Sequence, residues 1–216
     1  MTITHHLPED LLVGLAASRL RPAMVLPLRV HLEACAVCRG RVRQLEAVGG
    51  ALLDEAEGRP LAAGALEQAM ARIGRPLGRA PVVRSAPLPM PPGAAWPAAL
   101  TRCRISRWHW MAPGMRWATA SVPEDPDGPL FLLRIAPGKS LARHTHRGVE
   151  FTQVLCGAFD DGRAVFGPGD FDMADGEIHH QPQVLAGEEC VCLAYVEDGL
   201  RYDNRLAGLV GRWIGM

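Results

Sequence analysis

The sequence predicts an α + β protein with two domains. Residues 1–73 carry apolar side chains at helical spacing, and residues 74–100 are rich in proline. Residues 101–216 contain short apolar or alternating runs separated by glycine, proline and aspartate. Helical periodicity in one part of the chain and strand periodicity in another predict a small helical bundle followed by an antiparallel β domain.

Four helices are expected in residues 1–73. Pro8 and the two acidic residues after it suit a first helical turn, where proline loses no needed N–H and acids face the positive end of the helix dipole. A second helix leads into His31. A third helix runs from about Ala36 until Gly58, and a fourth spans residues 61–73.

The segment 74–100 differs in composition from both of its neighbours. It reads GRPLGRAPVVRSAPLPMPPGAAWPAAL, with prolines throughout and no acidic residue. Proline fixes φ and lacks an N–H, so such a run holds neither a helix nor a central strand. We therefore expect a semi-rigid linker between the two domains.

Strand signals dominate after Thr101. The runs are short and are separated by turn residues at a spacing typical of an antiparallel sandwich or barrel. An apolar stretch at 206–213 predicts a short helix that docks on this domain. The expected strand regions are RCRISRWHWM, MRWATASV, PLFLLRIA, EFTQVLCGAF, RAVFGPGDFDMA and CVCLAYVE.

Charge and hydropathy exclude several classes of protein. Lys and Arg together number 23, as do Asp and Glu, so the formal net charge of zero argues against nucleic-acid or membrane partners. The opening MTITHHLPEDLL lacks the basic and apolar regions of a signal peptide, and no window has the roughly 18 apolar residues of a membrane span. We expect a cytoplasmic protein, in which the six cysteines are metal ligands, redox groups or core residues rather than disulfides.

The stretch HLEACAVC places three metal-ligand side chains within eight residues. His31 and Cys35 are four residues apart, which puts them on one helix face, and Cys38 follows three residues later. Neutral imidazole and thiolate are ligands that Zn²⁺ prefers, and a closed structural site needs four. His5 and His6 precede the first helix, and we favour His6 as the fourth ligand because it lies nearer the helix.

A redox pair is the alternative interpretation of Cys35 and Cys38. A thioredoxin-like CxxC follows a strand, and HLEACAVC lacks one, so we favour zinc. An HxxxCxxC motif in a small helical domain resembles the zinc-binding anti-sigma domain, over residues 1 to about 75. The resemblance implies that an upstream histidine completes the zinc site. It also implies that the domain binds an extracytoplasmic-function sigma factor.

A second set of ligands lies in the β domain. GKSLARHTHRGVEFTQVLCG fits Gly-x5-His-x-His-x3-Glu-x6-Gly, with His144, His146 and Glu150 at the ligand positions. Residues two apart on a strand share a face, and Glu150 can return to that face. Two imidazoles and a carboxylate suit Zn²⁺ or another divalent metal, so the spacing leaves the element open.

The segment FGPGDFDMADGEIHH adds a turn, a strand and two histidines. Together the two segments resemble the cupin superfamily, a jelly-roll barrel whose first motif supplies His, His and Glu and whose second supplies a histidine. In cupins the last histidine lies ten residues after the aspartate of the PGD turn. The resemblance therefore implies His180 rather than His179 as the fourth ligand of this site.

Cys190 and Cys192 alternate with Val191 in CVCLAYV and so share one face of a late strand. If they face the barrel interior they could form a redox-active thiol pair near the metal. Buried cysteine is also an ordinary small apolar residue, and the sequence leaves both interpretations open.

The order of the two domains is informative in itself. A zinc anti-sigma domain followed by a cupin-like domain resembles the ChrR-type anti-sigma factors over nearly the whole chain, including the opening HH pair, HLxxCxxC, HxHRGxE and CxCLA. The resemblance implies a non-enzymatic, one-to-one inhibitor of a sigma factor that releases its partner under singlet oxygen or related oxidative stress, with a protease as a further partner in release. A cupin dioxygenase or isomerase with an accessory zinc domain is the alternative function.

Overall fold

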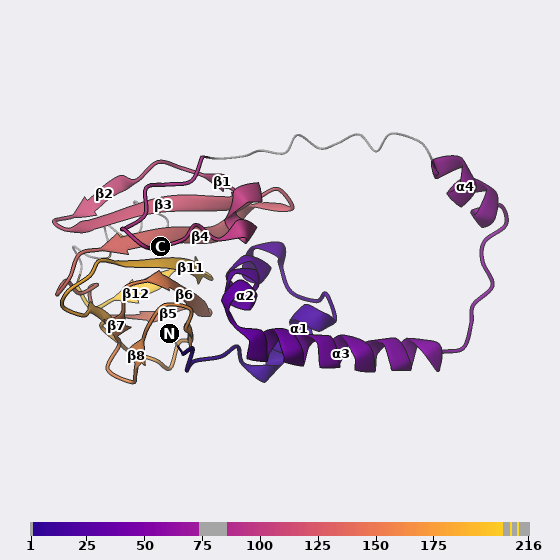
Figure 1. Cartoon of the computed structure of the whole chain (residues 1–216), viewed down its shortest axis with the longest axis horizontal. Coiled ribbons are helices and arrows are strands. Elements are labelled where there is room, and N and C mark those ends of the chain that lie inside the picture. Colours follow the sequence, from indigo (N-terminus) through magenta and orange to yellow (C-terminus); the bar gives the residue numbers. More distant parts are fainter. Residues whose placement is uncertain (1, 74–85, 205–207, 209–210, 212–216) are drawn as a thin grey trace.

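The computed structural model describes residues 2–73, 86–204, 208 and 211. One helix lies against one side of a β barrel, two more pack together beside it with the longer one extending away from the barrel, and a fourth helix lies apart (Figure 1). The fold class predicted from the sequence is confirmed. The helices are α1 (Glu9–Ala16), α2 (Pro22–Ala34), α3 (Ala36–Asp54) and α4 (Ala65–Arg72).

The helices begin and end for local reasons. Pro8 directly precedes α1, and two acidic residues occupy its first turn. Cys35 ends α2 and begins α3, because its extended backbone breaks the helix while its sulfur accepts the Cys38 N–H at 3.4 Å. The fourth helix is shorter than predicted, since Gly64 adopts a left-handed φ of 75° directly before it.

The described strands pair antiparallel throughout. The largest sheet has the order β1-β3-β4-β11-β6-β9, with β2 beside β3, and smaller sheets β10-β7-β8 and β12-β5 complete the barrel. The strands are β1 (Arg104–Ile105), β2 (His109–Ala112), β3 (Met115–Val122), β4 (Asp125–Ile135), β5 (His144–His146), β6 (Glu150–Cys156), β7 (Phe159–Asp160), β8 (Val165–Phe166), β9 (Phe171–Ala174), β10 (Gln183–Val184), β11 (Cys190–Val196) and β12 (Leu200–Tyr202).

The central strands of the large sheet are buried on both faces. Along β11, Cys192 and Ala194 belong to the core inside the barrel, whereas Leu193 and Tyr195 belong to the core shared with the helices. This explains why CVCLAYV is a continuous apolar run rather than an alternating one. The helices therefore cover the outer face of the sheet.

Helix α2 makes most of this contact, against β4, β6 and β11 (Figure 1). Gly128 at the start of β4 permits the close approach, because a Cβ at this position would lie 2.3 Å from the Cβ of Ala23 in α2. Arg21, directly before α2, forms an ion pair with Asp125 at 2.6 Å. Helices and barrel are thus held by both apolar and polar contacts.

Part of the predicted linker packs onto the folded protein. Residues Ala98–Arg102 form a 3-10 helix, and Leu100 is only 1% exposed. The carboxylate of Glu33 in α2 accepts the N–H groups of Ala98 and Ala99 at 2.8 and 2.6 Å. The end of the segment is therefore a contact between helix and barrel, because its apolar residues are buried despite the prolines around them.

Two segments for which the sequence predicts a structure lie outside the described residues, wholly or in large part. Residues 74–85 of the linker, and most of the docking helix expected at 206–213, are outside the described residues. The domain boundaries at 73 and 100 remain a prediction. Among the helices described, none is long and apolar enough to cross a membrane.

Candidate metal centres

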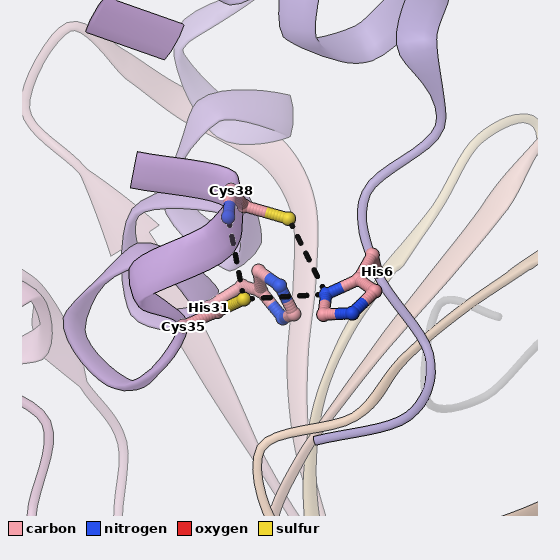
Figure 2. Close-up of side chains that lie close together, drawn as sticks. All are labelled: His6, His31, Cys35 and Cys38. Atoms are coloured by element: carbon pink, nitrogen blue, oxygen red, sulfur yellow. Dashed lines mark hydrogen bonds between the residues drawn. The ribbon is translucent and has the colours of Figure 1, made fainter. Parts of the chain in front are cut away.

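The first cluster gathers His6, His31, Cys35 and Cys38 from three segments of the chain (Figure 2). His6 lies in the segment before α1, His31 in the last turn of α2, and the cysteines at the start of α3. The His6 Nδ1 lies 3.3 Å from the sulfur of Cys35 and 3.7 Å from that of Cys38. One ligand atom from each of the four residues lies within 4.8 Å of all the others.

Burial gives this cluster the chemistry of a metal site. His31 and Cys38 are fully buried and Cys35 is 2% exposed. Burial raises the pKa of the Cys38 thiol to about 11, so the metal-binding thiolate is costly here without a bound cation. Burial also lowers the pKa of His31, which favours the neutral imidazole that binds metals.

One ring nitrogen tests whether these residues fit a metal. The Nε2 of His31 is buried and has no hydrogen-bond partner among the described residues. A buried polar atom without a partner is costly, and a bound cation would satisfy it. The two sulfurs and two imidazoles form the mixed ligand set that Zn²⁺ accepts.

His5, the other candidate at the start of the chain, points elsewhere. Its Nδ1 lies 3.4 Å from the carboxylate of Asp170, and its ring lies against Phe166 in β8. The structure therefore brings His6, and not His5, to the cysteines, in agreement with the choice made from the sequence.

The second cluster lies inside the barrel and contains His144, His146, Glu150 and His180. These residues are between 1% and 8% exposed. The His146 Nε2 lies 2.7 Å from Glu150 Oε2, and the His144 Nε2 lies 3.1 Å from the Nε2 of His180. The isolated β-bridge between His144 and His180 brings the two cupin motifs together.

Backbone carbonyls orient two of these rings. The Nδ1 of His144 contacts the carbonyl of Ala142 at 2.7 Å, and the Nδ1 of His146 contacts that of Asp175 at 2.9 Å. A carbonyl accepts only, so each Nδ1 carries a proton, and each Nε2 is the ring atom that faces the other ligands, where a bound metal would take the place of a proton. This is the arrangement expected of histidines that bind a metal.

The charges within the barrel cluster also suit a cation. Burial acts to raise the pKa of Glu150, but hydrogen bonds and charge from His144 and His146 outweigh it, and the net pKa lies below the ordinary value. Burial lowers the pKa of His180 to about 4 and so keeps this ring neutral. The cluster therefore offers a carboxylate and, at His180, a neutral imidazole. At His146 burial acts to lower the pKa, but the hydrogen bond and charge of Glu150 outweigh it and the net pKa lies above the ordinary value.

Sequence reasoning missed a group of charges behind His180. The Asp161 carboxylate lies 3.5 Å from the His180 Nδ1, and Arg163 contacts both Asp161, at 2.6 Å, and Asp172, at 2.8 Å. Burial raises the pKa of Asp172 to about 6 despite the nearby guanidinium. The Asp-x-Arg spacing was visible in DDGR, but Asp172 lies in β9, and no local period places it beside Arg163.

His179 is exposed and contacts Asp203 at 2.8 Å, so the ring used in the barrel cluster is that of His180. Cys190 and Cys192 face the barrel interior with their sulfurs 3.5 Å apart. They line a cavity of about 30 Å³ together with Glu150 and His180. The Cys190 contact and burial raise the pKa of Cys192 well above its usual value, and the redox role of the pair remains a prediction.

Comparison with known proteins decides the family. The sequence model of the family described as the ChrR cupin-like domain matches residues 97–198. The anti-sigma-E factor ChrR of Cereibacter sphaeroides is 38% identical over 211 residues, which cover 97% of each chain. The chain belongs to the ChrR family of anti-sigma factors.

A solved structure of the same family supports the fold. The fold of this chain resembles that of a chain in the crystal structure of Rhodobacter sphaeroides SigE in complex with the anti-sigma ChrR, with a TM-score of 0.71 and 34% sequence identity. The match covers 91% of this chain and 100% of the other. The ChrR-type resemblance drawn from the sequence is thus confirmed, and family and ligand cluster together indicate metal binding.

Proposed function

We propose that this chain binds and inhibits an extracytoplasmic-function sigma factor as a one-to-one complex in the cytoplasm. The observation that carries the proposal is its likeness, over 91% of its length, to a ChrR chain solved with SigE. The partner's identity beyond its class is left to experiment. Binding to the sigma factor would keep it from RNA polymerase, so the chain would act on transcription without touching DNA.

The exposed apolar side chains of α3 and α4 support a protein partner. Helix α4 has no buried residue, and its Leu66, Met70 and Ile73 recur at helical spacing while remaining 60% to 73% exposed. The far end of α3 continues this pattern with Leu52 and Leu53, which are 64% and 74% exposed. Both helices extend away from the barrel (Figure 1). Such surfaces are typical of interaction sites.

The His/Cys cluster has a structural task in this proposal. Zn²⁺ held by His6, His31, Cys35 and Cys38 would fix the segment before α1 to the junction of α2 and α3. The small helical part buries few residues of its own, so metal binding would supply much of its folding free energy.

The barrel cluster has the sensory task. Zn²⁺ or another divalent metal held by His144, His146, Glu150 and His180 would make the barrel responsive to singlet oxygen or related oxidants, and the response would release the sigma factor, with proteolysis of the inhibitor as a further step. The cavity beside the cluster measures about 30 Å³. A second pocket of about 410 Å³ also borders His180, so the preference for regulation over a dioxygenase or isomerase rests on the likeness to ChrR and not on cavity size.

Co-purification with the sigma factor tests the proposal. Leu66→Glu with Met70→Glu places two charges on the apolar face of α4, and we expect at least a tenfold loss of affinity. Gln68→Glu is the control, because it adds one negative charge to an exposed position off that face of the same helix, and it is compared with each single variant as well as with the double variant. Equal binding by the double variant and the control would remove α4 from the interface, and absence of any complex with wild-type chain would end the proposal.

A further inference from the structure

A barrel residue contacts a ligand of the helical cluster. The Nδ1 of His31 lies 3.1 Å from the side-chain oxygen of Gln153 in β6, and Gln153 is 1% exposed. The Gln153 amide nitrogen donates to the carbonyl of Val154 at 3.0 Å, which fixes the orientation of the amide. Its oxygen therefore faces His31 and can only accept, so the Nδ1 of His31 carries the proton.

This hydrogen bond decides which atom of His31 can bind a metal. With the proton on Nδ1, the lone pair lies on Nε2, the buried atom that has no hydrogen-bond partner among the described residues. That atom is directed to the group formed with His6 and the two cysteines. Gln153 thus orients the ring of His31 by accepting its Nδ1–H. The carbonyls of Ala142 and Asp175 orient His144 and His146 in the same way.

A second barrel residue fixes the chain that carries His6. The Asp170 carboxylate accepts the backbone N–H groups of Thr4 and His5 at 2.8 and 2.9 Å. In return, the N–H of Phe171 donates to the carbonyl of His5 at 3.2 Å. The two residues directly before His6 are therefore bound to the turn that opens β9.

We propose that the barrel, through Gln153 and Asp170, positions two of the four ligands of the helical zinc cluster. The helices alone supply the ligand atoms, but the ring of His31 and the backbone before His6 are oriented only when the helices are docked. Zinc affinity and docking are then thermodynamically linked, so each strengthens the other by the same factor. The inference rests on the proposed zinc site and adds that residues of the barrel determine the orientation of two of its ligands.

Cobalt affinity of the full-length chain tests this inference, because Co²⁺ bound by thiolates has a charge-transfer absorption that the His/Glu ligands of the barrel cannot give. Gln153→Met removes the acceptor with little change in size, and we expect a 10- to 100-fold loss of affinity, the usual effect of losing such a partner. Gln153→Glu retains an acceptor for the His31 N–H, so its affinity should stay near that of wild type. Gln183→Met on the exposed side of β10 is the control.

Wild-type affinity in Gln153→Met would overturn the role of Gln153. Failure of the proposed zinc site itself is distinguishable, since the wild-type chain would then lack the thiolate absorption and Cys35→Ser would change nothing. Gln153 is buried, so its variants could lose affinity by misfolding. Thr4→Pro avoids this problem, because Thr4 is exposed and the substitution removes one N–H donor to Asp170. We expect a several-fold weaker affinity from it, and an unchanged value would overturn the role of Asp170.

Discussion

The two ligand clusters differ in which parts of the chain supply and orient their residues. In the barrel cluster, all four residues belong to one domain, and carbonyls of that domain orient His144 and His146. In the helical cluster, the four residues come from three segments, and the partner of His31 belongs to the barrel. We expect the sheet framework to hold the barrel ligands in place without an ion, and the helical cluster to depend on its ion and on the contact with the barrel. The first suits a responsive site and the second a structural one.

Removing the helical metal site should have the largest effect. With Cys35→Ser and Cys38→Ser, we expect loss of tight zinc binding, of part of the helical structure and of sigma binding, because structural zinc in small domains contributes about 10–16 kcal/mol of apparent free energy. Far-ultraviolet circular dichroism and sigma capture would measure these losses. The barrel should stay folded, and wild-type sigma affinity in this variant would contradict the proposed division of tasks.

The barrel metal site should give the opposite pattern. His144→Ala is expected to leave sigma affinity within about twofold of wild type and to abolish release by singlet oxygen, since the ring is remote from α3 and α4 but central to the barrel cluster. A reporter driven by the sigma factor, with and without photosensitiser, would measure the response. His179→Ala is the control, because this exposed neighbour lies outside the cluster. Retained signalling in His144→Ala would refute the sensory role.

A methyl group added between α2 and β4 should weaken the docking of the helices on the barrel without changing any residue of either cluster. Gly128→Ala places its Cβ against Ala23, and we expect a loss of about 1–3 kcal/mol in the free energy of unfolding together with weaker metal binding at the helical cluster. Denaturant unfolding and cobalt titration would measure the two effects. Gly58→Ala is the control, because nothing lies within 4 Å of an added Cβ there and its φ, like that of Gly128, is not positive.

The smallest expected effect is a pH dependence at Asp170. Burial acts to raise the pKa of this carboxyl, but hydrogen bonds from the N–H groups of His5, Gly167 and Thr4 outweigh it, and the folded pKa lies below the ordinary value. A depressed carboxyl pKa contributes stability above the unfolded value, near 4, and loses it as pH falls through the folded value. Asp170→Asn should therefore cost about 1–2 kcal/mol near pH 7 in metal-free protein.

That cost should shrink as the pH falls below 4, because protonation then removes the same charge from the wild-type chain. Thermal unfolding of both chains in excess chelator, between pH 3 and pH 7, would measure the difference. A gap that stays constant over this range would assign the effect of Asp170→Asn to lost packing rather than to charge.

Local spacing accounts for most of the clustering of the side chains in the two clusters, and their role as metal ligands stays a prediction. His31, Cys35 and Cys38 lie within one helix and its junction, so their spacing alone brings them together. His144, His146 and Glu150 depend in the same way on strand period and one short turn. His6 was favoured for its position next to the first helix and His180 for the resemblance to cupins, because the partners of both are distant in the sequence and no local period places them.

Docking between the two regions could not be predicted from the sequence. Gln153 is one of three polar residues in β6, with Glu150 and Thr152, and nothing in EFTQVLCGAF tells which element covers it. Leu100 was assigned to a spacer because prolines surround it, although it is buried beneath the helices. Both depend on contacts between segments about a hundred residues apart, which no local period encodes.

One short stretch of backbone in β6 carries a residue of the barrel cluster and a residue that contacts the helical cluster. Glu150 points into the barrel and Gln153 points to the helices, so only three peptide units, about 10 Å of extended chain, separate the two metal environments. Residues on both faces of this strand are therefore constrained, one face by the barrel cluster and the other by the contact with His31. We expect sequence change among descendants of this chain to be slowest at β6 and faster at edge strands such as β2, where Trp110 is 68% exposed.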